Sequence, residues 1–381
     1  MKNVLIVAPD FYPNNTGFSN ATKNLIEAVV DCDKSYSFFV YTPALLGNKE
    51  EYKFAKVFRT HYNKIIYYKK QYKEICKIID DNNVDFILFE TNTFVFLQDR
   101  VLKKYGNRVA VRIHSTADTE VMIYKNGLGG FKSKIVKKAA TRFMNKCENI
   151  ICTNSYHQGF IFREFYGNNV YIMWSKKHFI LPNTTGIVGS ESFLGDYIFT
   201  LGKLSYDGYL QKGISDFIAA MLILKNRGIF VRAIIVGDGN YRCSVEDMIG
   251  FFGLKDRIVL VPSMSHDEVI ETAKKAKAVC LASRYEGQSM FATEALACGK
   301  PLILTTDNGM KDMINEGLNG YSVKTGDPNS IADKIQLLLS KDTHTLLEMG
   351  KNSRCLFDNM FSRQSIYNQF SYIFDTIVRE K

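Results

Sequence analysis

The segment from Ser283 to Pro301 combines residue types that can bind an anionic ligand at the start of a helix. An apolar strand should end just before it, where Gly287 allows close backbone approach and Ser289 is a candidate N-cap. Gly299, together with the proline, would end the helix. Exposed amides and the helix dipole favour phosphate there by about 0.3–1 kcal/mol. The segment therefore predicts a phosphate site at the carboxyl end of a parallel sheet.

Two carboxylates frame this expected site, Glu286 before the helix and Glu294 within it. Helical rise separates them by up to about 12 Å, which is too far for one catalytic pair of carboxylates. The spacing suits a long ligand with hydroxyls at both ends and a diphosphate between them, as in a nucleotide sugar. The alternative is that both glutamates only stabilise the helix dipole.

Two lysines, Lys203 and Lys212, belong to the loop that should follow the strand Tyr197–Leu201. Ammonium groups at the carboxyl end of a strand can neutralise a diphosphate. Each charge-assisted hydrogen bond of this kind contributes roughly 1.5–3 kcal/mol. The loop and the helix start therefore predict one shared anion site.

Short apolar, β-rich runs alternate with helical patterns in two series along the chain. The first series comprises Val4–Ala8, Phe38–Tyr41, Phe86–Phe89, Val109–Ile113 and Asn149–Thr153. The second comprises Tyr197–Leu201, Val231–Val236, Ile258–Val261, Ala278–Leu281 and Pro301–Thr305. This alternation predicts an α/β protein with two parallel-sheet domains.

The domain boundary is expected near residue 190, because residues 182–195 are rich in turn formers and read as a linker. We expect a first domain over 1–190, a second over 191–360 and a C-terminal helix over 361–381. That helix has an apolar face, which must pack against another part of the protein, formed by Phe361, Ile366, Phe370, Phe374 and Ile377.

The composition is that of a folded protein, with 46% hydrophobic and 23% charged residues among 381. Apolar runs have strand length, which argues against membrane-spanning helices, and the first ten residues do not resemble a signal peptide. Eight cysteines without a C-x-x-C pair indicate reduced thiols and neither a disulfide framework nor a zinc site. The sequence thus predicts a cytoplasmic protein.

The positive charge lies in the first half, where residues 1–190 carry 27 Lys and Arg against 16 Asp and Glu. Residues 191–381 carry 22 against 23. Residues 131–146 predict a basic amphipathic helix, which suits either an anionic membrane surface or ordinary packing on a sheet. The basic half therefore suggests an anionic partner, the alternative being a solvated lysine-rich surface.

With Glu286, Glu294 and the two lysines, the chain resembles the retaining glycosyltransferases of family four, which are also described as glycosyl transferases group 1. The resemblance covers Glu286 and Glu294 with Ala295–Pro301, and also Gly202–Leu204, Lys212–Gly213, Val236–Gly239, Asp307–Gly309, Glu316–Gly320, Pro9–Gly17, Arg112–His114 and Pro182–Asn183. It implies the GT-B fold, in which two Rossmann-like domains face each other across a cleft. The first binds the acceptor, the second binds the donor, and the C-terminal helix crosses back to the first.

The resemblance also implies a role for each matched residue. Lys203 and Lys212 would hold the diphosphate, Glu286 would bind the donor sugar, and Glu294 would bind the ribose hydroxyls. The full implied donor site is Gly17, Lys203, Lys212, Met264, Glu286, Gly287, Gln288, Ser289, Met290 and Glu294. The implied catalytic residues are Glu286, His114 and Lys212, although a strand-end histidine such as His114 also fits a structural role.

The implied reaction is retaining, metal-independent transfer of a hexose from a nucleotide-diphosphate sugar to a saccharide. The leaving diphosphate would accept the acceptor's proton, and no cofactor is expected. We expect a UDP-sugar donor and a lipid-linked acceptor, in the synthesis of a bacterial capsule, lipopolysaccharide O-antigen or exopolysaccharide. The enzyme would be cytoplasmic, with possible peripheral contact at the inner, anionic membrane face.

Two alternatives of the same fold stay open: a UDP-sugar 2-epimerase and a non-catalytic partner subunit that binds a nucleotide sugar. The segment around Glu286 fits the epimerases less well, and a degenerate subunit would be expected to lose one of the charged residues. Nucleic-acid binding would explain the basic half of the chain but not the expected anion site, so no nucleic acid is expected as partner.

Overall fold

The computed structural model describes residues 1–14, 16–43, 49–60, 68–90, 95–114, 142–161, 177–187 and 194–379. It divides into two compact units. Unit one comprises Met1–Gly186 and Phe361–Lys381, and unit two comprises Ile187–Met360. Most of the predicted basic helix over 131–146 lies outside the described residues, and so does the expected boundary near residue 190.

Unit one is built on a sheet whose described strands follow the order β3-β4-β2-β1-β5-β6-β7-β8. They are β1 (Lys2–Val7), β2 (Tyr36–Pro43), β3 (Lys49–Glu51), β4 (Lys56–Thr60), β5 (Phe86–Phe89), β6 (Val109–Ile113), β7 (Asn149–Cys152) and β8 (Lys177–Ile180). All pairs are parallel except the pair of β3 with β4. The strand order reverses at β1, because β2 lies on one side of it and β5 on the other.

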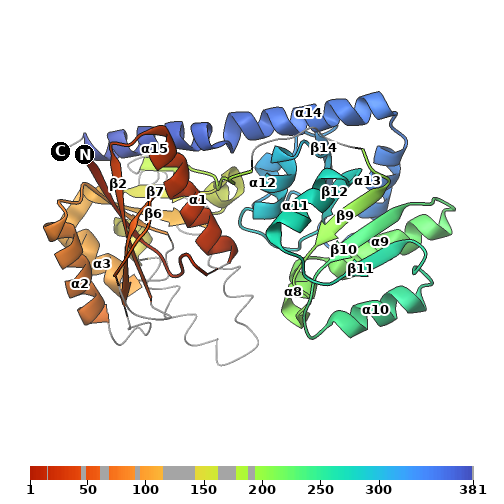
Figure 1. The fold of residues 1–381 in the computed structure, drawn as a ribbon, viewed down its shortest axis with the longest axis horizontal. Coiled ribbons are helices and arrows are strands. Elements are labelled where there is room, and N and C mark those ends of the chain that lie inside the picture. The colour runs from red at the N-terminus through yellow and green to blue at the C-terminus, as the bar shows by residue number, and fades with distance from the viewer. Residues whose placement is uncertain are drawn as a thin grey trace. The chain divides into compact units, whose positions relative to one another are not determined.

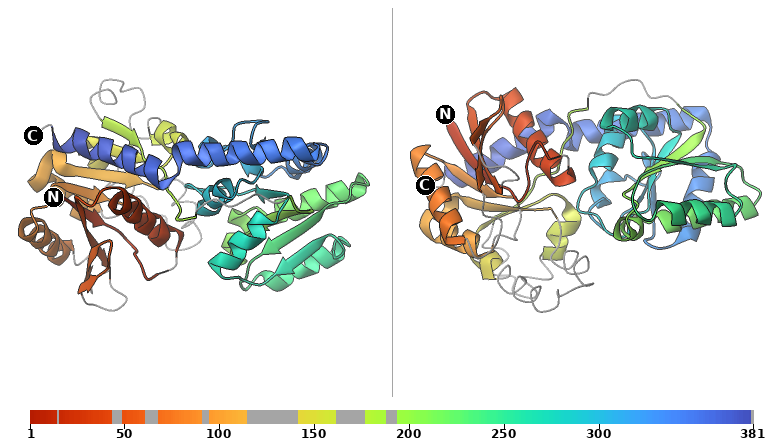
Figure 2. Two further views of the ribbon diagram at one scale, coloured as in Figure 1. Left: turned by 45° about the horizontal axis from the view of Figure 1, so that its top comes forward. Right: turned by 60° about the horizontal axis from the view of Figure 1, so that its bottom comes forward.

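Helices cover both faces of this sheet (Figures 1 and 2). They are α1 (Gly17–Cys32), α2 (Tyr68–Asp81), α3 (Val95–Tyr105), α6 (Ser155–Ile161) and α15 (Arg363–Val378). One core lies between the sheet and the pair α1 and α15, and another lies between the sheet and the pair α2 and α3. The C-terminal helix therefore completes the core of unit one, and its predicted apolar face is buried there.

Unit two has a parallel sheet of order β11-β10-β9-β12-β13-β14. Its strands are β9 (Tyr197–Leu201), β10 (Arg232–Val236), β11 (Ile258–Val261), β12 (Ala278–Leu281), β13 (Leu302–Thr305) and β14 (Gly320–Val323). Its helices are α8 (Tyr206–Gln211), α9 (Ile214–Asn226), α10 (Arg242–Phe251), α11 (His266–Lys274), α12 (Met290–Ala297), α13 (Pro328–Leu339) and α14 (Thr343–Met360). Here the strand order reverses between β9 and β12.

The predicted α/β class with two parallel sheets is confirmed, and all ten predicted strands are present within a residue or two. Four strands were not predicted: β3, β4, β8 and β14. Strand β8 has the sequence KHFI and is only half-buried, while β14 has the sequence GYSV and begins with a glycine. Neither is the continuous apolar run that marks a buried strand. Strand β3 also adds an antiparallel pair at the sheet edge.

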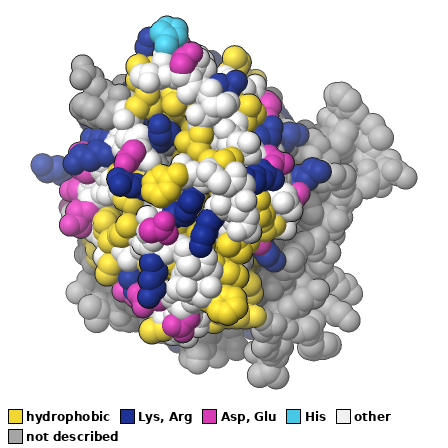
Figure 3. All heavy atoms as spheres, turned by 90° about the vertical axis from the view of Figure 1, so that its right-hand side faces the viewer, with side chains coloured by type: hydrophobic (Ala, Val, Ile, Leu, Met, Phe, Trp, Pro, Cys, Tyr) yellow, Lys and Arg dark blue, Asp and Glu magenta, His cyan; other side chains and the backbone are white. Residues whose placement is uncertain are grey.

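No helix among the described residues is long and apolar enough to cross a membrane. All eight cysteines have free thiols. On the face of the molecule seen in Figure 3, basic and acidic side chains are interspersed among apolar ones. This mixture agrees with the nearly balanced charge of residues 191–381.

His157 in α6 is a buried histidine that the sequence analysis did not single out; its exposed fraction is 1%. The Asn154 side-chain amide lies 3.2 Å from its Nδ1 and donates to the neutral ring. Burial, together with the nearby His114, lowers the pKa of His157 to about 4 from the ordinary 6.5. The folded protein therefore holds this ring neutral at pH values where the unfolded chain protonates it.

We expect the stability of unit one to fall as the pH decreases from about 6.5 to about 4, and His157→Gln to remove that part of the dependence. Between those pH values the unfolded chain binds a proton that the folded unit does not, which amounts to about 3 kcal/mol over the full range. Thermal unfolding midpoints measured from pH 4 to 7 test this. His344→Gln is the matched control, because His344 is exposed. If the unfolding midpoint of His157→Gln depended on pH as it does in the unmodified protein, the lowered pKa of His157 would be contradicted.

Candidate functional site

In unit two, the predicted residues meet at the point where the strand order reverses. Lys203 and Lys212 follow β9, and Glu286 and Ser289 follow β12, its neighbour in the sheet. Connections leaving two such strands diverge to opposite sides and leave a crevice at their carboxyl ends, where open α/β sheets bind ligands.

The loop after β9 is held in place by a helix cap and a glycine. Ser205 caps α8 by accepting a hydrogen bond from the backbone of Gly208, and Lys212 is the C-cap of the same helix. Gly213 follows with a φ of 62°, and a Cβ added there would lie 2.1 Å from the carbonyl oxygen of Ala282. Only glycine fits this position, so Lys212 is held against the end of β12.

The structure brings Lys212 and Glu286 together. The Lys212 ammonium contacts Oε1 of Glu286, and the Ser283 hydroxyl donates to the same oxygen over 3.2 Å. The exposed fraction is 26% for the lysine side chain and 10% for the glutamate side chain. One cation and one carboxylate thus lie side by side at the crevice. Lys203 lies on the same loop and is exposed.

A second ion pair ties the two loops together beside this contact. Arg284 donates from Nε and Nη2 to the two carboxylate oxygens of Asp216, over 3.0 and 2.9 Å. The Arg284 amide also donates to the carbonyl of Gln211 over 2.8 Å. Asp216 is nearly buried in α9, whereas Arg284 is partly exposed. This fork-shaped pair fixes the loop that carries Glu286 against the loop that carries Lys212.

The loop after β13 packs against the backbone of Glu286 and Gly287 and forms hydrogen bonds with the segment that carries them. The Asn308 side chain donates to the carbonyl of Ser283 over 3.0 Å, and the Gly309 amide donates to the carbonyl of Glu286 over 3.0 Å. A Cβ on Gly309 would lie 1.3 Å from the carbonyl oxygen of Gly287. The glycine at 309 is therefore required for the backbone at 286–287 to take this position.

The start of α12 is formed as predicted. Ser289 is its N-cap and accepts a hydrogen bond from the Ala292 amide over 3.2 Å, and Met290 is the first helical residue. Gly299 follows the helix with a φ of 63°. The Gln288 side chain is buried and donates to the Thr293 hydroxyl over 3.2 Å.

Glu294 contacts a histidine that was not among the predicted site residues. Its Oε1 lies 2.8 Å from Nε2 of His266, the first residue of α11. This hydrogen bond raises the pKa of His266, against the opposing effect of burial. Met264 lies half-buried in the segment between β11 and α11. The Ser265-x-x-Glu268 capping box signalled where α11 begins, but not what its first side chain contacts.

In unit one, the predicted residues also lie at carboxyl ends of strands. Gly17 begins α1, is exposed, and a Cβ added to it would have nothing within 4 Å. His114 follows β6, and its Nε2 contacts the carboxylate of Glu90, which follows β5. The ring of Phe18 packs against the imidazole, with 4.7 Å between ring centroids.

The Glu90 carboxylate is fully buried between His114 and Arg112. Burial alone would raise the pKa of Glu90, but the charge of Arg112 and the hydrogen bond from His114 outweigh burial, and the pKa is lowered. Burial lowers the pKa of His114 despite the carboxylate beside it. At neutral pH the ring is therefore neutral, and its Nε2–H donates to Glu90. His114 was among the predicted site residues, whereas Glu90, the buried partner that orients it, was not.

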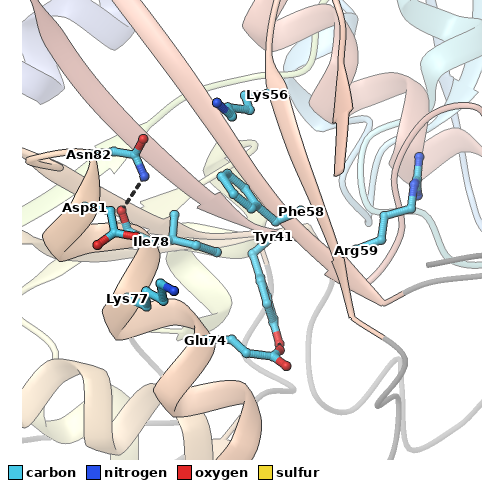
Figure 4. A pocket seen from close by; sticks show the side chains of 9 residues that line it. All are labelled: Tyr41, Lys56, Phe58, Arg59, Glu74, Lys77, Ile78, Asp81 and Asn82. Atoms are coloured by element: carbon cyan, nitrogen blue, oxygen red, sulfur yellow. Dashed lines mark hydrogen bonds between the residues drawn. The ribbon is translucent and has the colours of Figure 1, made fainter. Parts of the chain in front are cut away.

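A cavity of about 310 Å³ lies elsewhere in unit one, between α2 and the strands β2 and β4 (Figure 4). Its lining residues are Tyr41, Lys56, Phe58, Arg59, Glu74, Lys77, Ile78, Asp81 and Asn82. Several of its polar groups already have partners: the Tyr41 hydroxyl donates to Glu74 over 2.6 Å, and Lys56 pairs with Glu51 at 3.1 Å. None of the predicted site residues lines this cavity. Within the described residues, no group of three or more His, Cys, Asp and Glu could hold a metal ion.

Comparison with known proteins finds a family match within unit two. Residues 197–355 match the family model described as glycosyl transferases group 1. The uncharacterized glycosyltransferase MJ1178 of Methanocaldococcus jannaschii is 26% identical over 350 residues, which are 90% of this chain and 90% of that protein. The capsular polysaccharide biosynthesis glycosyltransferase CapM of Staphylococcus aureus is 26% identical over 192 residues, which are 50% of this chain and 48% of CapM.

Solved structures share the fold of the whole chain. Sucrose-phosphate synthase from Thermosynechococcus elongatus superposes with a TM-score of 0.77 at 16% identity, and 100% of each chain is covered. The Anabaena protein HepE in complex with UDP-glucose superposes with a TM-score of 0.67 at 16% identity, and 99% of this chain and 100% of that chain are covered. At such identities the likeness establishes the fold, which is the predicted GT-B fold.

We expect Arg284→Ala to destabilise unit two by about 1–3 kcal/mol, because the nearly buried Asp216 carboxylate would lose both of its charged hydrogen bonds. Arg232→Ala is the matched control, since it removes a pair of similar length (2.8 Å to Asp196) in which both side chains are mostly exposed. It should change stability by less than about 0.5 kcal/mol. Urea unfolding of both variants measures the difference, and equal losses would show that the Arg284 pair does not fix the two loops.

Proposed function

We propose that this chain, of which residues 197–355 match the glycosyl transferases group 1, is a retaining transferase that uses a nucleotide-diphosphate sugar. The observation that carries this proposal is the juxtaposition of Lys212 and Glu286 beside the capped start of α12, where the sheet order reverses. A diphosphate needs cations and exposed amides, and a sugar needs a carboxylate that accepts hydrogen bonds from its hydroxyls. Lys212, Glu286 and the start of α12 lie together beyond the carboxyl ends of β9 and β12.

In this proposal each end of the donor has its own residues in unit two. Lys203 and Lys212 bind the diphosphate, and the amides near Gln288 and Ser289 add donors at the helix start. Glu286 accepts hydrogen bonds from the donor sugar. Because Glu286 already holds Lys212, the sugar and the phosphate are positioned by one connected pair.

The nucleoside end of the donor lies toward α11. Glu294 accepts hydrogen bonds from the ribose hydroxyls, and the backbone near Met264 contacts the base. The backbone of Gly287 and Met290 contributes to the sugar end.

Two residues of unit one also have proposed roles. Gly17 gives the loop after β1 room to approach a phosphate, which agrees with the open space around its Cα. His114 lies near the transferred sugar and the acceptor. Nε2 is bound to Glu90, whereas Nδ1 has no hydrogen-bond partner within the described residues, so Nδ1 can accept a hydrogen bond from a hydroxyl.

The reaction itself needs stabilisation of charge as the glycosidic bond to the diphosphate breaks. Lys203, Lys212 and the dipole of α12 supply positive charge at the leaving group, which is the role that a metal ion has in other transferases. The departing diphosphate accepts the proton of the attacking hydroxyl on the same face of the sugar, which retains the anomeric configuration. We therefore propose that the enzyme needs neither a metal nor a cofactor.

The donor and acceptor classes are proposed from the comparisons and the charge. HepE is described in complex with UDP-glucose, which supports a UDP-sugar. CapM is named for capsular polysaccharide biosynthesis, which supports a saccharide acceptor in a surface polysaccharide. The excess of lysine and arginine in residues 1–190 favours an acceptor with a lipid-linked diphosphate at the cytoplasmic membrane face.

We expect one of UDP, GDP and ADP to raise the thermal unfolding midpoint, UDP being the expected one, because a ligand at 100 times its Kd adds about 2.7 kcal/mol of stability. Lys212→Ala should abolish most of this shift. It should also lower sugar transfer by about 100-fold or more, through loss of charge stabilisation at the leaving group.

Lys351→Ala is the control for this experiment, because Lys351 is an exposed lysine of the same unit. Its shift and transfer rate should equal those of the unmodified protein. Release of free epimerised sugar without an acceptor would indicate the epimerase instead. Nucleotide binding without any turnover across a panel of lipid-linked saccharides would indicate a non-catalytic subunit, and absence of any shift would exclude the donor site.

A further inference from the structure

Glu294, the proposed ribose ligand, is held by a side chain from a different helix. Nε2 of His266 in α11 lies 2.8 Å from Oε1 of Glu294 in α12. Among the described residues, His266 is the one side chain that hydrogen-bonds this carboxylate. The second carboxylate oxygen of Glu294, Oε2, can therefore accept a hydrogen bond from a ligand.

The position of His266 is fixed by its own helix start. Ser265 caps α11, and its amide and hydroxyl donate to Oε2 of Glu268 over 2.8 and 2.7 Å. This capping box holds the backbone of His266 at the first helical position. The backbone that carries the imidazole is therefore part of a capped helix and not of a loop.

The burial of the two partners differs in a way that suits a ligand site. The His266 side chain is 53% exposed, whereas the Glu294 side chain is 10% exposed. Because the histidine is not packed in a core, its loss should not disturb the fold. The hydrogen bond to Glu294 and the charge of Asp267 both raise the pKa of His266, so its Nε2–H is firmly a donor to the carboxylate.

We propose that His266 is a positioning residue for the donor's ribose, which holds Oε1 of Glu294 so that Oε2 is aimed at a ribose hydroxyl. The inference rests on the proposed role of Glu294. A carboxylate whose rotamer is fixed before binding loses less conformational freedom when the ligand arrives. His266 therefore increases selectivity for ribonucleotides over nucleotides that lack the ribose hydroxyls.

The test compares two ligands across three proteins by calorimetric titration. The ligands are UDP and 2′,3′-dideoxy-UDP, or the same pair of GDP or ADP if the thermal screen selects that base. The proteins are the unmodified chain, His266→Ala and His266→Gln. In His266→Ala we expect the ribonucleotide to bind about tenfold more weakly and the dideoxynucleotide to bind unchanged. In His266→Gln, whose amide can donate to Oε1, most of the preference should return.

Two further variants separate the possible failures. Glu294→Gln should remove the preference for ribonucleotide. If it does not, the proposed role of Glu294 is wrong, and the role of His266 fails with it. If Glu294→Gln removes the preference but His266→Ala keeps it, only the inference about His266 is overturned. Equal weakening of both ligands in His266→Ala would show a merely structural role, and His344→Ala, at an exposed histidine, should change neither affinity.

Discussion

A buried ion pair in unit one sets the path of the chain around it. Arg112 is fully buried in β6, and a buried guanidinium is tolerated only when its charge and its N–H groups have partners. Glu90 supplies the charge, and residues 181–183 supply oxygens at 2.8 to 3.2 Å. The segment that leads out of unit one is thus fixed by the needs of one side chain. The same carboxylate orients His114, so a stability requirement also positions a candidate catalytic residue.

The two units share the reversal of strand order in their sheets but differ in the polar groups at the carboxyl ends of their strands. In each, the strand order reverses beside a central strand, β1 or β9, and charged or polar side chains gather at the carboxyl ends. In unit one the gathered charges are buried and satisfy one another. In unit two Lys212 and Glu286 remain partly exposed, while a separate ion pair, between the nearly buried Asp216 and the exposed Arg284, holds the two loops together. Because a different ion pair holds the two loops together, a ligand could contact Lys212 and Glu286 without breaking that connection.

The sequence predicted what depends on local pattern. Apolar runs located the central strands, and Ser289 and Gly299 located both ends of α12, because caps and turns are determined by residues a few positions apart. The pairs Asp216–Arg284 and His266–Glu294 join residues 68 and 28 positions apart, and no local pattern sets which loops become neighbours. Strand β8 was not predicted because it lies at the edge of the sheet and is only half-buried, so its sequence is not a continuous apolar run.

The route of the chain has a consequence for biosynthesis. Unit two is inserted into unit one, whose core includes Ile366, Phe370 and Phe374 of α15. A ribosome releases the strands of unit one first, yet they lack part of their apolar cover until the last helix emerges. Unit two, whose residues are contiguous, can close its core earlier. Unit one is therefore completed after unit two, although its strands are made before it, and the incomplete sheet is the species that chaperones would need to protect during translation.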